Sequence, residues 1–168
     1  MYTIRKATVN DVDTILQIAD TTWWATYSAI LEREQIEFML AEIYSAEKIG
    51  KQVADNLQTY LLLEEEGTPV AFAAYSPRDE NPDIYKLHKL YCLPQTQGKG
   101  YGKILINEVA NKTREAGKEI LELNVNRYNQ AKSFYEKMGF AVAYEEDIAI
   151  GPYWMNDYVM RKELLCFC

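Results

Sequence analysis

Apolar positions along the chain follow two periods, one typical of strands and one typical of helices. Short runs rich in apolar and aromatic residues, several of them bounded by turn residues, predict strands. The predicted strands are Tyr2–Lys6, Thr59–Glu64, Pro69–Tyr75, Asp83–Cys92, Lys118–Val125, Phe140–Ile150 and Tyr153–Arg161. The turn signal at residues 66–68 predicts that the second and third strands form an antiparallel hairpin.

Apolar residues at helical spacing predict helices between these strands. The first helix begins near Val12, and Asn10 is placed to cap its free N–H groups. The other predicted helices are Leu31–Ala54 with a break near Ser45, Gly100–Ala116 and Asn129–Met138. The order β, α, α, β, β, β, α, β, α, β, β predicts a mixed sheet with helices on both faces.

Composition favours one folded domain that spans residues 1–168. Apolar residues make up 48% of the chain and charged residues 26%, which suits a packed core and argues against global disorder. The net charge is -7 and no basic stripe exists, so we expect no nucleic-acid partner, whereas a cationic partner would be attracted. The chain contains no run of 18 apolar residues, which a membrane span would require, so we expect no membrane partner.

Three cysteines, Cys92, Cys166 and Cys168, do not form a disulfide framework or a zinc signature. Reduced thiols are the simplest interpretation. The N-terminus also lacks the apolar segment of a secretory leader. We therefore expect a cytoplasmic protein without a bound metal.

The segment between the fourth predicted strand and the helix that follows carries glycines at positions 98, 100 and 102. Without Cβ atoms, a backbone can turn tightly and approach a ligand closely. The free N–H groups at a helix start favour an anion there. The segment therefore predicts a phosphate or pyrophosphate site. It is not a Walker loop, because Lys103 is followed by Ile104, and the third glycine comes one residue early for a dinucleotide fingerprint.

This segment resembles the Q/R-x-x-G-x-G/A signature of the GCN5-related N-acetyltransferase (GNAT) family, which it matches at 97–102. The segment 126–140, with its Asn-x-x-Asn-x-Ala-x-x-Phe-Tyr-x-x-x-Gly-Phe pattern, resembles a second conserved stretch of that family, and residues 4–11 resemble its usual start. The resemblance implies an α/β (α+β) fold, with a mixed, mostly antiparallel sheet of six to seven strands, splayed at strands four and five. It also implies that acetyl-CoA is the co-substrate, and dimers are common in the family.

By this resemblance, the backbone of the glycine loop holds the pyrophosphate of CoA. The implied residues are Gln97, Gly98, Lys99, Gly100, Tyr101 and Gly102, with Lys103 near a phosphate. The pantetheine arm would pair with the fourth strand at Leu90, Tyr91 and Cys92. Asn129 would contact the same arm, although it is also placed to cap its own helix.

Family chemistry is direct transfer of the acetyl group to an amine. Tyr135 stands at the usual position of the acid that protonates the leaving thiolate, and a phenol is protonated at neutral pH. Where some relatives carry a glutamate base, this chain has His88, its single histidine, which ordinarily titrates near neutral pH. A covalent mechanism through Cys92 is not favoured, since His88 lies four residues away along an extended strand.

The acceptor is expected to be a small amine, such as a polyamine. In this fold the N-terminal helices and the last hairpin usually build the acceptor site, and here they offer carboxylates and aromatic rings that suit a cation. The candidate acceptor residues are Trp23, Trp24, Tyr27, Glu145 and Tyr153. The alternatives are an amine of a peptide or protein, a non-catalytic CoA-binding module and a nucleotide-binding protein.

Overall fold

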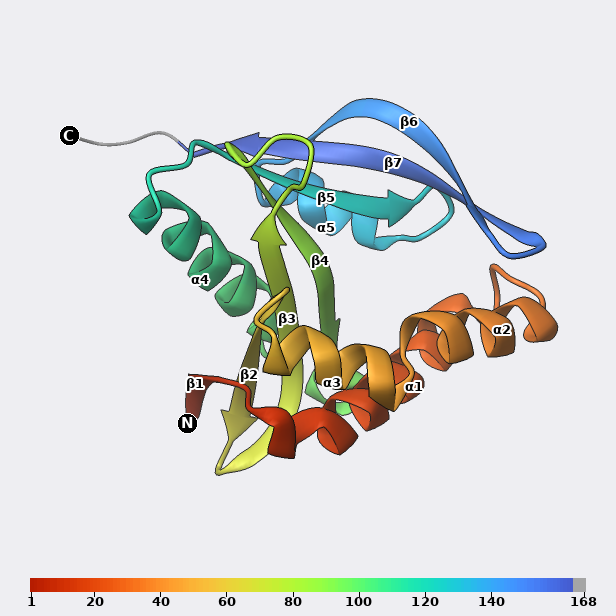
Figure 1. The fold of residues 1–168 in the computed structure, drawn as a ribbon, viewed down its shortest axis with the longest axis horizontal. Coiled ribbons are helices and arrows are strands. Elements are labelled where there is room, and N and C mark those ends of the chain that lie inside the picture. Colours follow the sequence, from red (N-terminus) through yellow and green to blue (C-terminus); the bar gives the residue numbers. More distant parts are fainter. Residues whose placement is uncertain (165–168) are drawn as a thin grey trace.

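The protein is described by a computed structural model for residues 1–164, and Cys166 and Cys168 lie outside the described residues. A seven-stranded sheet runs through the molecule in the order β1-β2-β3-β4-β5-β7-β6 (Figure 1). Its strands are β1 (Tyr2–Lys6), β2 (Thr59–Glu65), β3 (Thr68–Pro77), β4 (Ile84–Cys92), β5 (Ile120–Asn126), β6 (Ala141–Ile150) and β7 (Tyr153–Glu163). All the predicted strands are therefore present.

Helices cover both faces of this sheet, as the sequence predicted. One face carries α1 (Val12–Tyr27), α2 (Arg33–Ile43) and α3 (Ala46–Ala54), and the other carries α4 (Tyr101–Glu115) and α5 (Ala131–Lys137) (Figure 1). Two short 3-10 turns, η1 (Val9–Asp11) and η2 (Pro94–Thr96), precede α1 and α4. No helix within residues 1–164 has both the length and the apolar character that a membrane span requires.

Each sheet face has its own apolar core, because the strand side chains alternate between the two helical layers. Leu105, Ile106 and Val109 of α4 pack on one face. Ile15 and Trp23 of α1 pack on the other. The central strand β3 is buried on both sides, and the site described below lies where the sheet between these layers opens.

The β4–β5 pair is the one parallel pair in the sheet, and it is short. Cα partners run from Ile84 and Ile120 to Leu87 and Leu123, and beyond them β4 and β5 diverge (Figure 1). At the paired end, the buried carboxylate of Glu122 holds Arg78 at 3.0 Å and Arg161 at 2.9 Å. The splay at strands four and five that the family resemblance implied is therefore confirmed.

A β-bulge at His88 sets which side chains of β4 face which layer. The partners across β3 pass from Tyr75 and Leu87 to Ala74 and Lys89, so His88 has no partner of its own in the register. Leu87 therefore faces the α4 layer, whereas Lys89 and Tyr91 both turn toward the N-terminal helices. Without the bulge, strict alternation would put all three residues on one face.

The start of α1 differs from the prediction, which placed Asn10 as its cap. Thr8 and Asp11 instead form a capping box around η1, in which Thr8 Oγ1 accepts from the Asn10 backbone N–H and Asp11 Oδ2 accepts from the Thr8 backbone N–H. Arg5 also donates to both oxygens of Asp11, at 2.9 and 2.8 Å. These hydrogen bonds hold the pKa of Asp11 down at about 2. The carboxylate thus fixes β1 to the start of α1.

Candidate functional site

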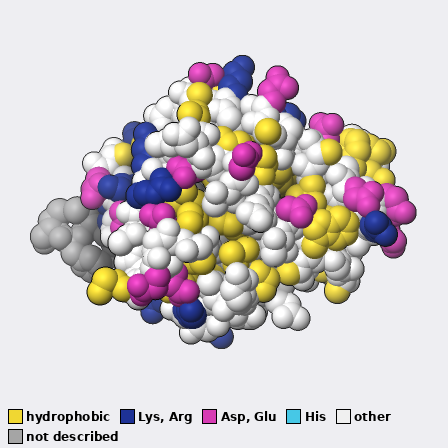
Figure 2. Space-filling view, turned by 90° about the horizontal axis from the view of Figure 1, so that it is seen from below, with side chains coloured by type: hydrophobic (Ala, Val, Ile, Leu, Met, Phe, Trp, Pro, Cys, Tyr) yellow, Lys and Arg dark blue, Asp and Glu magenta, His cyan; other side chains and the backbone are white. Residues whose placement is uncertain are grey.

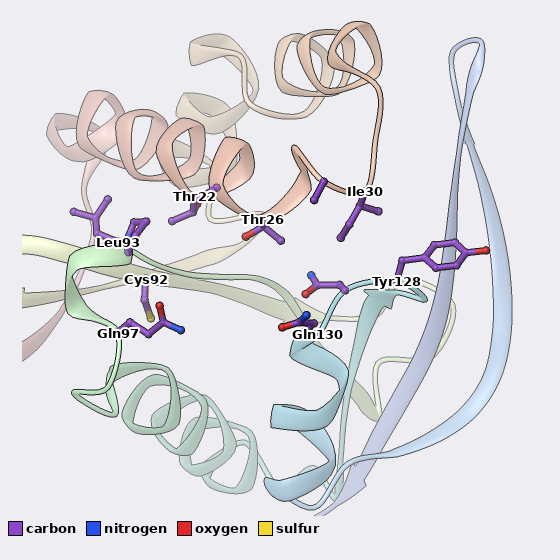
Figure 3. A pocket seen from close by; sticks show the side chains of 12 residues that line it. Thr22, Thr26, Ile30, Cys92, Leu93, Gln97, Tyr128 and Gln130 are labelled. Carbon is purple, nitrogen blue, oxygen red and sulfur yellow. The ribbon is translucent and has the colours of Figure 1, made fainter.

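Two neighbouring cavities lie at the place where β4 and β5 part. The larger, about 880 Å³, lies between α1 and the segments that follow β4 and β5 (Figure 3). The smaller, about 130 Å³, lies in the splay itself. Thr26 and Asn129 line both cavities, so the two spaces adjoin each other.

The face of α1 toward the larger cavity carries small side chains. Thr22 and Thr26 face Cys92 and Gln97 across the space (Figure 3). Ala25 of α1 lines the same cavity, and so does Ala29 in the turn that follows the helix. Small residues at these positions leave room between α1 and the sheet, and the sequence analysis overlooked this signal.

The glycine loop leads from β4 into α4 and presents free backbone N–H groups. Gly98 and Gly100 adopt φ of +88° and +78°, a left-handed conformation that other residues rarely adopt, and no atom lies within 4 Å of a Cβ built at either position. The N–H groups of Gln97 and Lys99 bond within the loop, to Pro94 and Thr96. Those of Gly98 and of 100–103 have no acceptor among the described residues, and the last three begin α4.

Two side chains of this segment bond to the sheet and do not cover the free backbone N–H groups of the loop. The ammonium of Lys99 lies 2.7 Å from Glu65 in β2, and the hydroxyl of Tyr101 donates to the same carboxylate. The loop is therefore anchored to the sheet through side chains and leaves its backbone amides free. The third glycine, Gly102, has a different role, because a Cβ there would lie 3.5 Å from the ring of Phe134 in α5.

The edge of β4 that faces β5 is unpaired beyond Leu87, and it borders both cavities. Leu90 and Tyr91 line the smaller cavity, and Cys92 lines the larger one. Burial raises the pKa of Cys92 to about 11, so its thiol stays protonated at neutral pH and is a poor nucleophile. An extended ligand that adds to this edge would satisfy the free backbone groups.

Tyr135 and His88, the two candidate catalytic residues, line the same small cavity. Burial, with the nearby Tyr91 and Cys92, raises the pKa of Tyr135, so its hydroxyl keeps its proton at neutral pH. The Nε2 atom of His88 lies 2.7 Å from the Ser76 hydroxyl. Burial, with two neighbouring lysines, lowers the pKa of His88 to about 3. The expectation that this imidazole titrates near neutral pH is therefore wrong.

Asn129 caps the start of its helix and also faces ligand space. Its Oδ1 accepts from the Ala131 backbone N–H at 2.9 Å, and the residue lines both cavities. The sequence left a capping role and a ligand contact open for this residue, and the geometry is compatible with both.

The acceptor candidates are spread more widely than the sequence suggested. Trp23 is core, 3% exposed, with its indole N–H donating to the Tyr91 hydroxyl at 3.1 Å. Trp24 is partly buried against the same core, and Tyr153 packs on Phe38 of α2. Of the aromatic candidates, Tyr27 alone lines either of these two cavities.

Glu145 lies on the face of β6 away from α1. Glu146, Ile148 and Ile150 alternate along β6, and the two isoleucines pack against the core under α1. Glu145 therefore faces the other way, where it lies 3.6 Å from Arg127. The acidic residue of this strand that faces the N-terminal helices is Glu146.

Asn124 and Asp157 are polar residues near the cavities that the sequence analysis missed. Asn124 lies on β5, which borders the splay, and Asp157 lies on the next strand, β7; the amide of Asn124 donates to Asp157 Oδ2 at 3.2 Å. Asn124 lines the smaller cavity, and Asp157 is 6% exposed. The signal in the sequence was a polar side chain at an inward position of each strand, such as Asp157 between Met155 and Val159.

Lys89 is a buried cation on the wall of the same cavity. It is 6% exposed, and its ammonium donates to Gln58 at 2.7 Å and to Gln52 at 3.2 Å. The rings of Tyr60 and Tyr44 lie 5.2 and 5.9 Å from it. No carboxylate among residues 1–164 pairs with it, and burial lowers the pKa of Lys89 to about 7.

Comparison with known proteins gives consistent matches. The sequence profile of the acetyltransferase (GNAT) family matches residues 16–140. The spermidine N(1)-acetyltransferase of Thermoplasma acidophilum is 28% identical over 165 residues, covering 95% of this chain and 96% of that protein. The crystal structure of a PaiA N-acetyltransferase from Thermoplasma acidophilum, in complex with coenzyme A, matches with a TM-score of 0.83 at 28% identity, covering 97% of this chain and 99% of that one. The ribosomal-protein-S18-alanine N-acetyltransferase of Escherichia coli shares the fold, with a TM-score of 0.73 at 18% identity. The match covers 98% of this chain and 94% of that one.

The environment of Lys89 predicts a pH-dependent stability. Its pKa is about 7 in the folded protein and near 10.5 in an unfolded chain. The unfolded state thus binds more protons between these values, so the cost of the buried charge is full below pH 7 and falls as pH rises. We expect the free energy of unfolding, measured by urea titration, to rise by about 2 kcal/mol from pH 7 to pH 9.

The variant Lys89→Met should lose most of that rise, whereas Lys48→Met, at an exposed lysine of α3, should keep it. An unchanged slope in Lys89→Met would show that another group carries the pH dependence.

Proposed function

The chain belongs to the acetyltransferase (GNAT) family and is an acetyl-CoA-dependent N-acetyltransferase, and from that premise we propose that its acceptor is a small cationic amine such as a polyamine. We also propose which residues of this chain carry the reaction. The observation on which the proposal depends is the set of free backbone amides of the glycine loop beside the unpaired edge of β4.

The site fits CoA by shape and by hydrogen bonding. Five free N–H groups, those of Gly98 and 100–103, stand at the N-terminus of α4, where an anion is favoured. The space that Cβ atoms would fill at Gly98 and Gly100 is left open. The larger cavity leads from Gln97 to Asn129 and gives the pantetheine arm a path along β4. When bound, acetyl-CoA supplies the thioester carbonyl that the amine attacks.

We assign the proton-donating role to Tyr135. Tyr135 lines the cavity in the splay, and its hydroxyl group stays protonated at neutral pH because burial raises the pKa of the phenol. A protonated phenol can give its proton to the sulfur atom that leaves the acetyl group. His88 keeps a part in this proposal as a neutral hydrogen-bonding group of the cavity wall, oriented by Ser76.

The charge around the acceptor side supports a cationic substrate. Asp157 of β7 and Glu146 of β6 are cross-strand partners that face the N-terminal helices. On the face seen in Figure 2, acidic side chains are scattered among apolar ones, and lysines and arginines lie mainly toward the margins. The net charge of -7 adds long-range attraction for cations. A relative named for spermidine acetylation points the same way.

The acceptor preference can be tested with spermidine, a neutral-tailed monoamine and a peptide with an N-terminal alanine, each at saturating acetyl-CoA. We expect kcat/KM for spermidine to exceed that for the peptide by roughly tenfold or more, the worth of one charge-assisted hydrogen bond. Thiol release gives the rate. A preference for the peptide would favour a protein or peptide acceptor, and tight CoA binding without release on any amine would favour a non-catalytic module.

Gly100→Glu should abolish detectable CoA binding in titration calorimetry. The new side chain would occupy the space in front of the free amides, and its charge would repel the diphosphate. Gly117→Glu is a matched control, because Gly117 follows the other end of α4 with the same φ of +78° and equally open surroundings. Unchanged CoA affinity in Gly100→Glu would remove the loop from the binding site.

Tyr135→Phe should lower kcat by on the order of 100-fold and leave CoA affinity nearly unchanged, because it removes a proton donor and keeps the ring. Tyr85→Phe controls for the loss of a phenol on the same face of the sheet outside the cavities. Steady-state kinetics with varied amine separate kcat from KM. Full activity of Tyr135→Phe would exclude it as the acid.

A further inference from the structure

Two buried oxygen atoms beside the reaction site have no hydrogen-bond donor within the described part of the chain. They are Oδ1 of Asn124 and Oδ1 of Asp157. The two side chains are already joined, since Asn124 Nδ2 donates to Asp157 Oδ2. That bond fixes the amide orientation, because a flipped amide would set its oxygen against the carboxylate. Both free atoms are therefore acceptors, and whatever satisfies them must be a donor.

The position of Asn124 and the charge of Asp157 both place the pair next to the proposed reaction site. Asn124 lines the cavity in the splay together with Tyr135 and His88. Asp157 stands one strand away, on the sheet face toward the N-terminal helices. Burial is the main cause that raises the pKa of Tyr91, and the charge of Asp157 adds to that shift.

No cation of the described residues neutralises Asp157. Arg127 donates to the Asp157 backbone oxygen at 3.2 Å and forms its ion pairs with Glu145 and Asp147. Lys86 forms no ion pair with Asp157 among the described residues, although its charge favours the ionised carboxylate. Burial is the main cause that raises the pKa of Asp157, and the charge of Glu146 adds to it. The hydrogen bond from Asn124 and the charges of Lys86 and Arg127 offset part of that rise. A buried carboxylate without a partner is costly, so a site of this kind favours a positively charged ligand.

We propose that Asn124 and Asp157 together form the docking point for a primary ammonium of the acceptor, with Asn124 Oδ1 and Asp157 Oδ1 each accepting a hydrogen bond from one of its N–H groups. This inference rests on the proposed function and names the recognition chemistry of that site. A primary ammonium carries three N–H donors and one positive charge, which matches two free acceptors, one of them anionic. The third N–H is left free, and a tertiary ammonium, with a single N–H, can satisfy one acceptor at most.

The test measures amine binding by titration calorimetry on the CoA-bound protein, so that it does not depend on turnover. Wild type is titrated with spermidine, with butylamine and with N,N-dimethylbutylamine, which keeps the charge and lacks two donors. Asp157→Asn keeps the shape and removes the charge. Asn124→Ala is a second variant that removes the other acceptor. Asp147→Asn is the control, because it changes the same charge on the opposite face of the hairpin.

We expect Asp157→Asn to weaken spermidine binding on the order of 10- to 100-fold, and Asn124→Ala to weaken it less. Butylamine should bind wild type at least roughly tenfold more tightly than its dimethyl counterpart. Asp157→Asn should melt at the same or a higher temperature than wild type, because a buried unpaired charge is gone. CoA affinity should be the same in all the variants and in wild type. Asp147→Asn should bind spermidine as tightly as wild type does.

Equal amine affinity in wild type, Asp157→Asn and Asn124→Ala would overturn the docking point, as would failure of wild type to bind any of the amines. Amine binding that depends on Asp157 without acetyl transfer would uphold the docking point and contradict the proposed function. Acetyl transfer by Asp157→Asn with the wild-type KM for the amine would uphold the proposed function and contradict the docking point.

Discussion

The hydrogen-bonded pairing of β4 and β5 stops after Leu87 and Leu123, and the rest of the site depends on that interruption. If β4 and β5 were paired along their whole length, the backbone groups of β4 would be hydrogen-bonded to β5. No opening would then exist between the two strands. At the paired end, the ion pairs of Glu122 tie β5 to Arg161 of β7 and to Arg78, which follows β3. The opening is thus a fixed feature of the sheet, with the glycine loop, Tyr135 and Asn124 set around it.

The bulge at His88 adds a second constraint. It turns Lys89 and Tyr91 toward the N-terminal helices and lets Leu90 and Cys92 pack on the α4 side. Polar groups with few partners consequently gather around the opening, and the buried Lys89 is among them. Such groups reduce stability, and proteins retain them where binding or chemistry uses them. The acetyltransferase activity of the family gives this arrangement a use.

Different parts of the chain are suited to bind the two substrates. The backbone of the glycine loop and the edge of β4 suit CoA, an anion with an extended arm. The carboxylates of Asp157 and Glu146 face the N-terminal helices, where they would attract the proposed cationic acceptor. Under the proposed function, CoA and a cationic acceptor would therefore approach the same splay from regions of opposite electrostatic character.

Sequence alone determined the order of the elements, the mixed sheet and the glycine loop, because these depend on periodicity and on conformations that glycine adopts within a few residues. It also made Tyr135 a candidate, through a segment that resembles a motif of the family. Only the tertiary structure decided which side of a strand or helix met the cavity. Trp23 is core, Glu145 faces away from α1, and His88 is too buried to titrate near neutral pH. The pairing of Asn124 with Asp157 and the burial of Lys89 likewise join residues distant in the chain. Burial and register depend on how strands align across the sheet, and no local pattern records that alignment.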